Sequence, residues 1–112
     1  MKPDERDLAY VWDMLDAAGR IQRLLRGLDY GAFVEDDRTS LAIERLLENV
    51  GEAARHVSPK LQRTHPEIPW QGIIGIRNVL AHQYGVVDQR KVWQAATHGI
   101  AELMPLLEKL LR

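Results

Sequence analysis

The chain has 112 residues, of which 46% are hydrophobic and 28% charged, as in one soluble globular domain over residues 1–112 rather than in a disordered tail. Its formal net charge is −1, so the molecule as a whole is not basic and nucleic-acid contacts have to come from a local patch. It has no cysteine, which excludes disulfides and thiolate metal sites and favours a cytoplasmic location.

The first predicted helix runs from about Asp4 to Gly27. Its apolar residues recur at spacings of three and four and therefore share one face: Leu8, Val11, Leu15, Ala18, Ile21 and Leu25. Asp4 is the expected N-cap, with Asp7 as an imperfect capping-box partner, and Gly27 is the expected stop. Gly19 should weaken the helix by about 1 kcal/mol relative to alanine, unless another backbone packs closely there. Residues 1–7 are charged and lack the apolar centre of a signal peptide.

An irregular segment, residues 28–39, separates this helix from a second one. Phe33 is expected to attach the segment to the core, with at most one helical turn around it. The second helix is predicted from about Ser40 to His56 and should end before Pro59, because the residue before a proline avoids the helical conformation. Its apolar stripe comprises Ile43, Leu46, Leu47, Val50, Ala53, Ala54 and Val57.

Residues 58–69 contain three prolines and are predicted to form an ordered connection. Pro69 suits the first turn of a third helix, expected from Trp70 to about His82. Its apolar members are Ile73, Ile74, Ile76, Val79 and Leu80, and Gly72 and Gly75 would allow a neighbouring helix to approach.

The last predicted helix begins after an Asp88 N-cap and continues to the C-terminus. Pro105 should kink or split it near residues 97–104. No segment has the alternating pattern of a strand, and no apolar run approaches the roughly 20 residues that span a bilayer. The predicted fold is therefore all-α, an antiparallel four- to five-helix up-down bundle, with no contact to a membrane.

Residues 76–84 concentrate polar side chains at the end of an otherwise apolar helix. Asn78 and His82 are four positions apart and share a face, whereas Arg77 and His82 are five apart and flank one edge. Tyr84 follows directly. The segment thus predicts a small polar cluster in which an imidazole and a guanidinium lie close together.

Cleavage of an RNA phosphodiester without a metal needs a base, an acid and a cation at the phosphate. Histidine suits the two proton transfers because its pKa lies near neutral pH, and arginine offers a fixed fork of donors to phosphate oxygens. One His82 for each chain supplies one proton carrier, so a symmetric dimer with two facing motifs would supply both. A purely structural alternative remains open: Arg77 caps an acidic neighbour, His82 donates near a helix end and Tyr84 packs on the rim.

The run RNVLAHQYGVVD, which contains Arg77, Asn78, His82 and Tyr84, resembles the signature of HepT-type toxins of the HEPN superfamily. The run AIERLLENVGEAARHVS is similar to the second conserved helix of that family, and HPEIPWQGIIGIRN is similar to its lead-in to the catalytic helix. The likeness covers nearly the whole chain.

This resemblance implies a helical homodimer that cleaves RNA without a metal or another cofactor. It implies catalytic roles for Arg77 and His82, an orienting role for Asn78, and a supporting and regulatory role for Tyr84. Such toxins are encoded with a minimal nucleotidyltransferase antitoxin of the MntA type, in type VII toxin–antitoxin systems. The antitoxin is expected to transfer AMP from ATP to Tyr84, where the added charge would block a phosphate site.

Two other readings of the same residues stay open. The fold could serve as a non-catalytic module that binds a nucleotide or the nucleotidyltransferase, or as a plain dimerisation bundle. Glu52 could approach the helix that carries Arg77, and the alternative is a salt bridge or a hydrogen bond to a helix end. One set of basic residues could follow an RNA backbone or be a solvated helix end: Arg55, His56, Lys60 and Arg63. A second set, Arg20, Arg23 and Arg26, recurs every three residues and is expected to be a solvated face.

Overall fold

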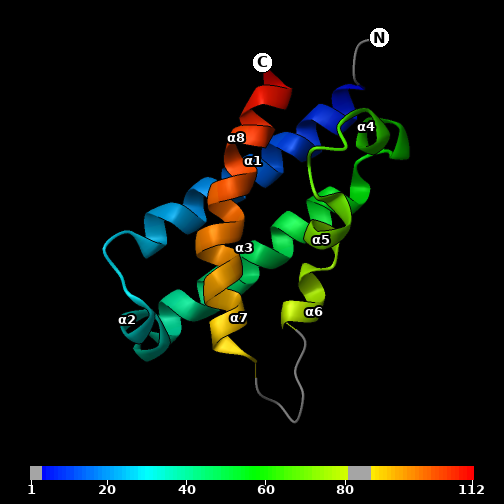
Figure 1. Cartoon of the computed structure of the whole chain (residues 1–112). Helices are drawn as coiled ribbons and strands as arrows, with labels where there is room; N and C mark the ends of the chain where they lie inside the picture. Colours follow the sequence, from blue (N-terminus) through cyan, green and yellow to red (C-terminus); the bar gives the residue numbers. More distant parts are fainter. Residues whose placement is uncertain (1–3, 81–86) are drawn as a thin grey trace.

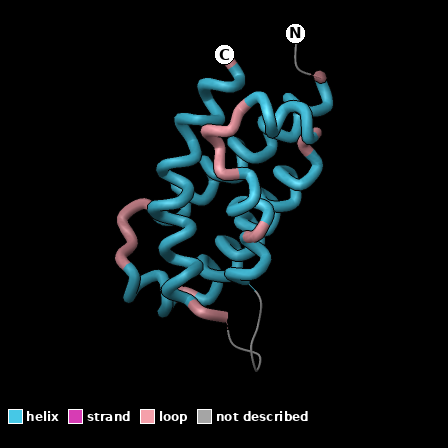
Figure 2. Tube along the Cα trace, turned by 45° about the vertical axis from the view of Figure 1, so that its right-hand side comes forward, coloured by secondary structure: helices cyan, strands magenta, loops and turns pink. Residues whose placement is uncertain are grey.

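The computed structural model describes residues 4–80 and 87–112, and these residues form helices joined by short connections (Figure 1). No strand occurs in the described ranges (Figure 2), so the all-α prediction is confirmed. The helical elements in chain order are α1 (Glu5–Leu25), α2 (Tyr30–Glu35), α3 (Asp37–His56), α4 (Pro59–Thr64), α5 (Trp70–Ile74), α6 (Ile76–Leu80), α7 (Gln89–Gln94), a π-helical turn (Ala95–Gly99) and α8 (Ile100–Leu111).

Helix α1, helix α3, the α5–α6 pair and the α7–α8 segment run in this order alternately down and up the bundle (Figure 1). Helix α1 packs along α3 and α8, and the other side of α3 receives α5 and α6. The core lies between these helices, since α1, α3, α5, α6 and α8 all contribute buried apolar side chains to one cluster. In the part of the chain that the structure describes, no helix is both long enough and apolar enough to cross a membrane.

Side-chain caps define where most of the helices begin. The Asp4 carboxylate accepts a hydrogen bond from the Arg6 N–H at 2.7 Å, and Asp88 accepts from the N–H groups of Arg90 and Lys91. Both predicted caps are thus confirmed. The expected start of the second long helix near Ser40 is wrong, because the Asp36 carboxylate already accepts from the Thr39 N–H at 3.1 Å and α3 begins at Asp37.

Two expectations about the helices have to be corrected. The connection over residues 58–69 contains α4, because Ser58 caps it and Pro59 occupies its first position. The single helix predicted from residue 70 breaks at Gly75, whose ψ of 2° separates α5 from α6. The irregularity expected near residues 97–104 is a π-helical turn over Ala95–Gly99 that overlaps this range, whereas Pro105 itself lies inside α8.

Asp7 does not act as the predicted capping-box partner, because its carboxylate is used elsewhere. Its two oxygens accept hydrogen bonds from the Ser58 N–H at 2.9 Å and the Ser58 hydroxyl at 2.6 Å. The side chain is buried, as expected of a carboxylate with two partners. This contact ties the first turn of α1 to the start of α4.

Replacing Gly19 with alanine should raise the free energy of unfolding by about 1 kcal/mol. A Cβ at this position would meet only the Arg23 Nη1 atom, at an ordinary contact distance of 3.5 Å. The substitution therefore raises the helix propensity of α1 without a steric clash. Gly27→Ala is the opposing control, because its φ of +81° lies in the left-handed region and the change should cost about 1 kcal/mol. The midpoints of urea-induced unfolding measure both effects, provided that the m-value is unchanged. A destabilised Gly19→Ala protein would contradict this packing.

Candidate functional site

Helix α6 presents the motif arginine to solvent because its other face is held by the core. Ile76 is buried, and Val79 and Leu80 pack against the core as partly buried side chains. Arg77 and Asn78 lie between these apolar positions and are exposed. The apolar spacing of this short helix thus determines which way the guanidinium and the amide can point.

Gly51 lets α5 and α6 approach α3 very closely. A Cβ at this position would lie 2.6 Å from the Ile76 Cγ2 atom and 3.1 Å from the Ile73 carbonyl oxygen. The first distance is shorter than packing allows, and the second is tighter than most Cβ contacts, so a neighbour would have to shift. The position of α6, and with it that of Arg77, therefore depends on the absence of a side chain at residue 51.

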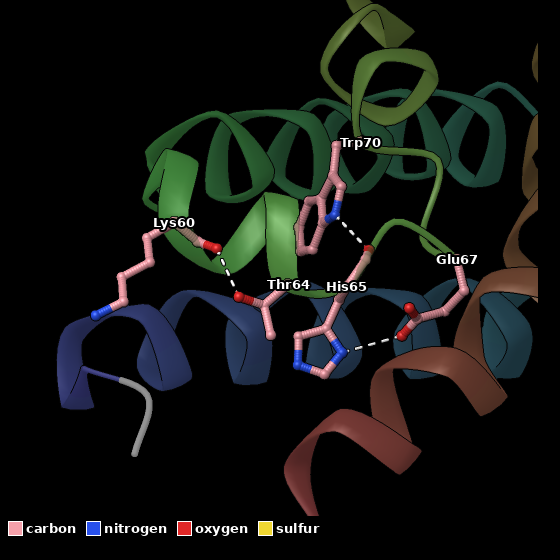
Figure 3. A network of polar contacts seen from close by, with 5 residues as sticks. All are labelled: Lys60, Thr64, His65, Glu67 and Trp70. Carbon is pink, nitrogen blue, oxygen red and sulfur yellow. Dashed lines mark hydrogen bonds and ion pairs between the residues drawn. The ribbon is translucent and has the colours of Figure 1, made fainter. Parts of the chain in front are cut away.

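A polar network holds the chain that leads into α5 (Figure 3). The Trp70 indole N–H donates to the His65 carbonyl oxygen at 2.9 Å, and the His65 ring pairs with the Glu67 carboxylate at 3.0 Å. The Thr64 hydroxyl donates to the Lys60 carbonyl oxygen within α4. His65 is thus structural in this fold, and Trp70 anchors the start of α5.

Glu52 forms the expected salt bridge, and its partner is not the motif arginine. Its carboxylate binds the Arg55 guanidinium at 2.6 Å and lies 3.9 Å from the His56 ring. The hydrogen bond from Arg55 lowers the pKa of Glu52, with smaller contributions from the charges of Arg55, His56 and Arg77. This carboxylate therefore stays ionised further into the acid range than a free glutamate does.

Arg77 makes no hydrogen bond or ion pair that involves another residue of the ranges 4–80 and 87–112, although it is close enough to Glu52 to affect its titration. The alternative in which Arg77 caps an acidic neighbour finds no support among these residues, because the Glu52 carboxylate, whose pKa the Arg77 charge lowers, is bound by Arg55 instead. An exposed guanidinium without an internal partner is available to an anion.

The other two motif residues, His82 and Tyr84, lie outside the described residues. The structure therefore places Arg77 and Asn78 on one exposed face of α6, and the approach of His82 and Tyr84 to them stays a prediction. Across the described part of the chain, no three histidine or acidic side chains are grouped closely enough to hold a metal ion.

A polar groove between α1 and α3 lies next to Glu52 and was not predicted from the sequence. It has a volume of about 530 Å³, and its polar and aromatic lining consists of Tyr10, Asp13, Asp16, Arg20, Asn49, Glu52 and His56. The signal for it was the spacing of Tyr10, Asp13, Asp16 and Arg20 at intervals of three and four, which places them on one face beside the apolar stripe.

Comparison with known proteins gives consistent matches over most of the chain. The family model described as "Ribonuclease HepT-like" matches residues 14–110. A "Probable ribonuclease HepT" of Thermococcus cleftensis is 34% identical over 98% of each chain. A "Putative RNase" of Methanocaldococcus jannaschii is 28% identical over 93% of this chain and 96% of its own, and one of Caldanaerobacter subterraneus is 31% identical over 92% of each. No solved structure matches the chain.

Proposed function

Because this chain belongs to the HepT-like ribonuclease family, we propose that it is an endoribonuclease and the toxin of a HEPN/MNT toxin–antitoxin pair. The observation that carries the proposal is the exposed Arg77 guanidinium, which has no hydrogen bond or ion-pair partner in residues 4–80 and 87–112. Arg77 directly follows Ile76, whose buried side chain fixes the orientation of α6. A phosphodiester is the anion that this arrangement suits, since the guanidinium fork matches two phosphate oxygens.

In the proposed reaction, Arg77 binds the scissile phosphate and stabilises the charge that builds up on its oxygens. His82 removes the proton of the ribose 2′-hydroxyl, and the 2′-oxygen attacks phosphorus. The bond to the 5′-oxygen breaks as that oxygen gains a proton, which leaves a 2′,3′-cyclic phosphate and a free 5′-hydroxyl. Asn78, which shares the exposed face of α6, orients the phosphate or the imidazole.

A homodimer fits this chemistry because one chain has a single motif histidine. Two motifs that face each other across a twofold axis would supply one imidazole as base and the other as acid, with two arginines at the phosphate. The dimer thus follows from the need for two proton carriers.

Regulation by the cognate antitoxin is assigned to Tyr84. An MntA-type nucleotidyltransferase would direct the Tyr84 phenol oxygen to the α-phosphorus of ATP, with release of pyrophosphate. The phenol proton is lost, and the tyrosine then carries AMP beside Arg77, where its negative charge competes with RNA. Co-expression with the antitoxin should raise the mass of the protein by whole AMP units, and Tyr84→Phe should abolish the increase. A mass increase that persists in Tyr84→Phe would contradict the assignment.

The test of the nuclease assignment is expression of the chain alone in cells, beside Arg77→Ala and His82→Ala. Wild-type protein should arrest growth and deplete RNA, and both variants should be harmless at equal protein levels. Equal toxicity of all three proteins would exclude this catalytic pair. Absence of toxicity and of RNA cleavage in the wild type, with nucleotide or antitoxin binding retained, would favour the non-catalytic module.

A further inference from the structure

The groove between α1 and α3 changes its character along its length. Its first part, defined above by Tyr10 and its polar neighbours, begins beside Glu52. A second hollow of about 480 Å³ continues it, and the two share Arg20 and Leu46. We name this second part the arginine hollow, since its lining contains three arginines: Arg20, Arg23 and Arg45.

The charged residues of each part of the groove determine which chemical groups of a ligand can bind there. Three carboxylates and one arginine line the first part, so acidic groups outnumber basic ones there: Asp13, Asp16, Glu52 and Arg20. Asp16 is paired with Arg20 and Glu52 with Arg55, but carboxylate oxygens can still accept hydrogen bonds from the exocyclic amino groups of nucleobases. Tyr10 is half-buried there, and its ring packs edge to face with the His56 ring at 5.3 Å between centroids, so two aromatic rings line this part. The Asn49 amide is a further hydrogen-bonding group.

The arginine hollow has the opposite preference. Arg20 is bound to Asp16 at 3.1 Å, and Arg45 lies 3.7 Å from Glu48, but both pairs are well exposed. Exposed ion pairs are worth little and exchange readily for a stronger anion. Arg23 forms no ion pair with a residue in the described ranges. The three guanidinium groups therefore form a small site for phosphate oxygens.

We propose that this continuous groove binds a single-stranded segment of the RNA next to the scissile bond. One base lies against Tyr10 in the carboxylate-lined part, and a backbone phosphate lies in the arginine hollow. The proposal rests on the ribonuclease function above, because the groove reaches Glu52, which directly follows Gly51, the residue against which α6, the helix of Arg77, packs. Tyr10 and Arg23 stand about 20 Å apart on α1 by helix rise, which is long enough for several nucleotides of an extended strand.

A polynucleotide fits this groove better than an acidic protein does. One part of the groove repels anions and the adjacent part attracts them. RNA has matching groups, because its bases carry hydrogen-bond donors and its backbone carries anionic phosphates. An acidic protein surface would meet repulsion from three carboxylates along the first part. The class of ligand that matches both parts is single-stranded RNA.

The test is equilibrium binding of a fluorescent RNA oligonucleotide whose 2′-oxygens are methylated, so that it cannot be cut. Arg23→Gln should weaken binding and make the dependence of log K on log salt shallower by about 0.7, the value for one lost phosphate contact with a single strand. Arg26→Gln is the matched control, because Arg26 lies, like Arg23, at the C-terminal end of α1, is exposed and does not line the hollow. It should leave the salt slope unchanged.

The aromatic half of the proposal needs its own pair of variants. Tyr10→Leu keeps an apolar side chain but removes the ring, and it should raise the Kd about 5- to 150-fold, the range that corresponds to loss of base–aromatic stacking. Tyr10→Phe should bind as tightly as the wild type within a few-fold. Circular dichroism melts of both variants identify a folding defect, in which case the Arg23 comparison alone decides.

Three outcomes would overturn the inference. The first is equal behaviour of Arg23→Gln and Arg26→Gln, and the second is unchanged binding in both Arg23→Gln and Tyr10→Leu. The third is normal RNA binding by these variants together with loss of co-purification with the antitoxin, which would make the groove a protein-docking surface. Because binding is measured without cleavage, failure of the groove is distinguishable from failure of the nuclease assignment, which appears as a wild type that cuts no RNA.

Discussion

Arg77→Lys should lower kcat/KM for RNA cleavage by about 100-fold. Lysine keeps the positive charge, but it loses the planar fork that binds two phosphate oxygens at once, and a point charge on a flexible chain is a poorer partner for the transition state. Arg77→Gln should lower the rate further, because the charge is also lost. The measurement is the initial rate of cleavage of a fluorescent RNA by purified protein.

The same changes should leave the fold intact. Arg77 is exposed and has no hydrogen bond or ion-pair partner in residues 4–80 and 87–112, so the free energy of unfolding should change by no more than about 0.5 kcal/mol. Arg26→Lys, an exposed arginine outside both the motif and the groove, is the matched control and should cleave at the wild-type rate. Wild-type rates for both Arg77→Lys and Arg77→Gln would remove this residue from the reaction.

Gly51→Ala should damage stability and activity together. The new Cβ would lie 2.6 Å from Ile76 Cγ2 and 3.1 Å from the Ile73 carbonyl oxygen, and relief of such overlap costs about 1–3 kcal/mol. The backbone of α5–α6 has to move away from α3, which displaces Arg77. Since a misplacement of about 1 Å can cost 100-fold in rate, cleavage should fall by up to that factor. Urea unfolding and cleavage rates measure the two effects.

A double-mutant cycle separates this contact from a general loss of stability. Ile76→Ala removes the Cγ2 atom and should by itself cost about 2–5 kcal/mol. Combined with Gly51→Ala, it should cost less than the sum of the two single changes, with a coupling of about 0.5–3 kcal/mol. Ile76→Val keeps Cγ2 and should show no such relief. Additive effects in both cycles would mean that the contact does not position α6.

Local sequence rules predicted the parts of this fold that depend on neighbouring residues. The apolar period of 3.6 identified both long helices, and the caps at Asp4 and Asp88 follow from their own first turns. The error at residues 58–69 arose because the three prolines predict an ordered connection without a helix, whereas α4 lies within it. Ser58 followed by Pro59 is also an N-cap followed by a favoured first helical residue, and that interpretation proved correct.

Features that join distant parts of the chain were beyond these rules. Nothing local distinguishes Gly51 from Gly19, yet one is pressed against α5–α6 and the other meets only a flexible arginine. The exposure of Arg77 was predictable, because it lies between apolar positions of its own helix. The assignment of the Glu52 carboxylate to Arg55 required the three-dimensional structure, since several cations compete for it.

The hydrogen bonds of Asp7 to Ser58 have a consequence for how the molecule opens. They connect the first turn of α1 to Ser58, the N-cap of α4. The N-terminal end of α1 therefore cannot fray without releasing the start of α4. Amide protons in these two segments should therefore exchange with solvent as one cooperative unit. Removal of the residues up to Asp7 would loosen a segment that lies more than fifty positions later, close to the approach to α5.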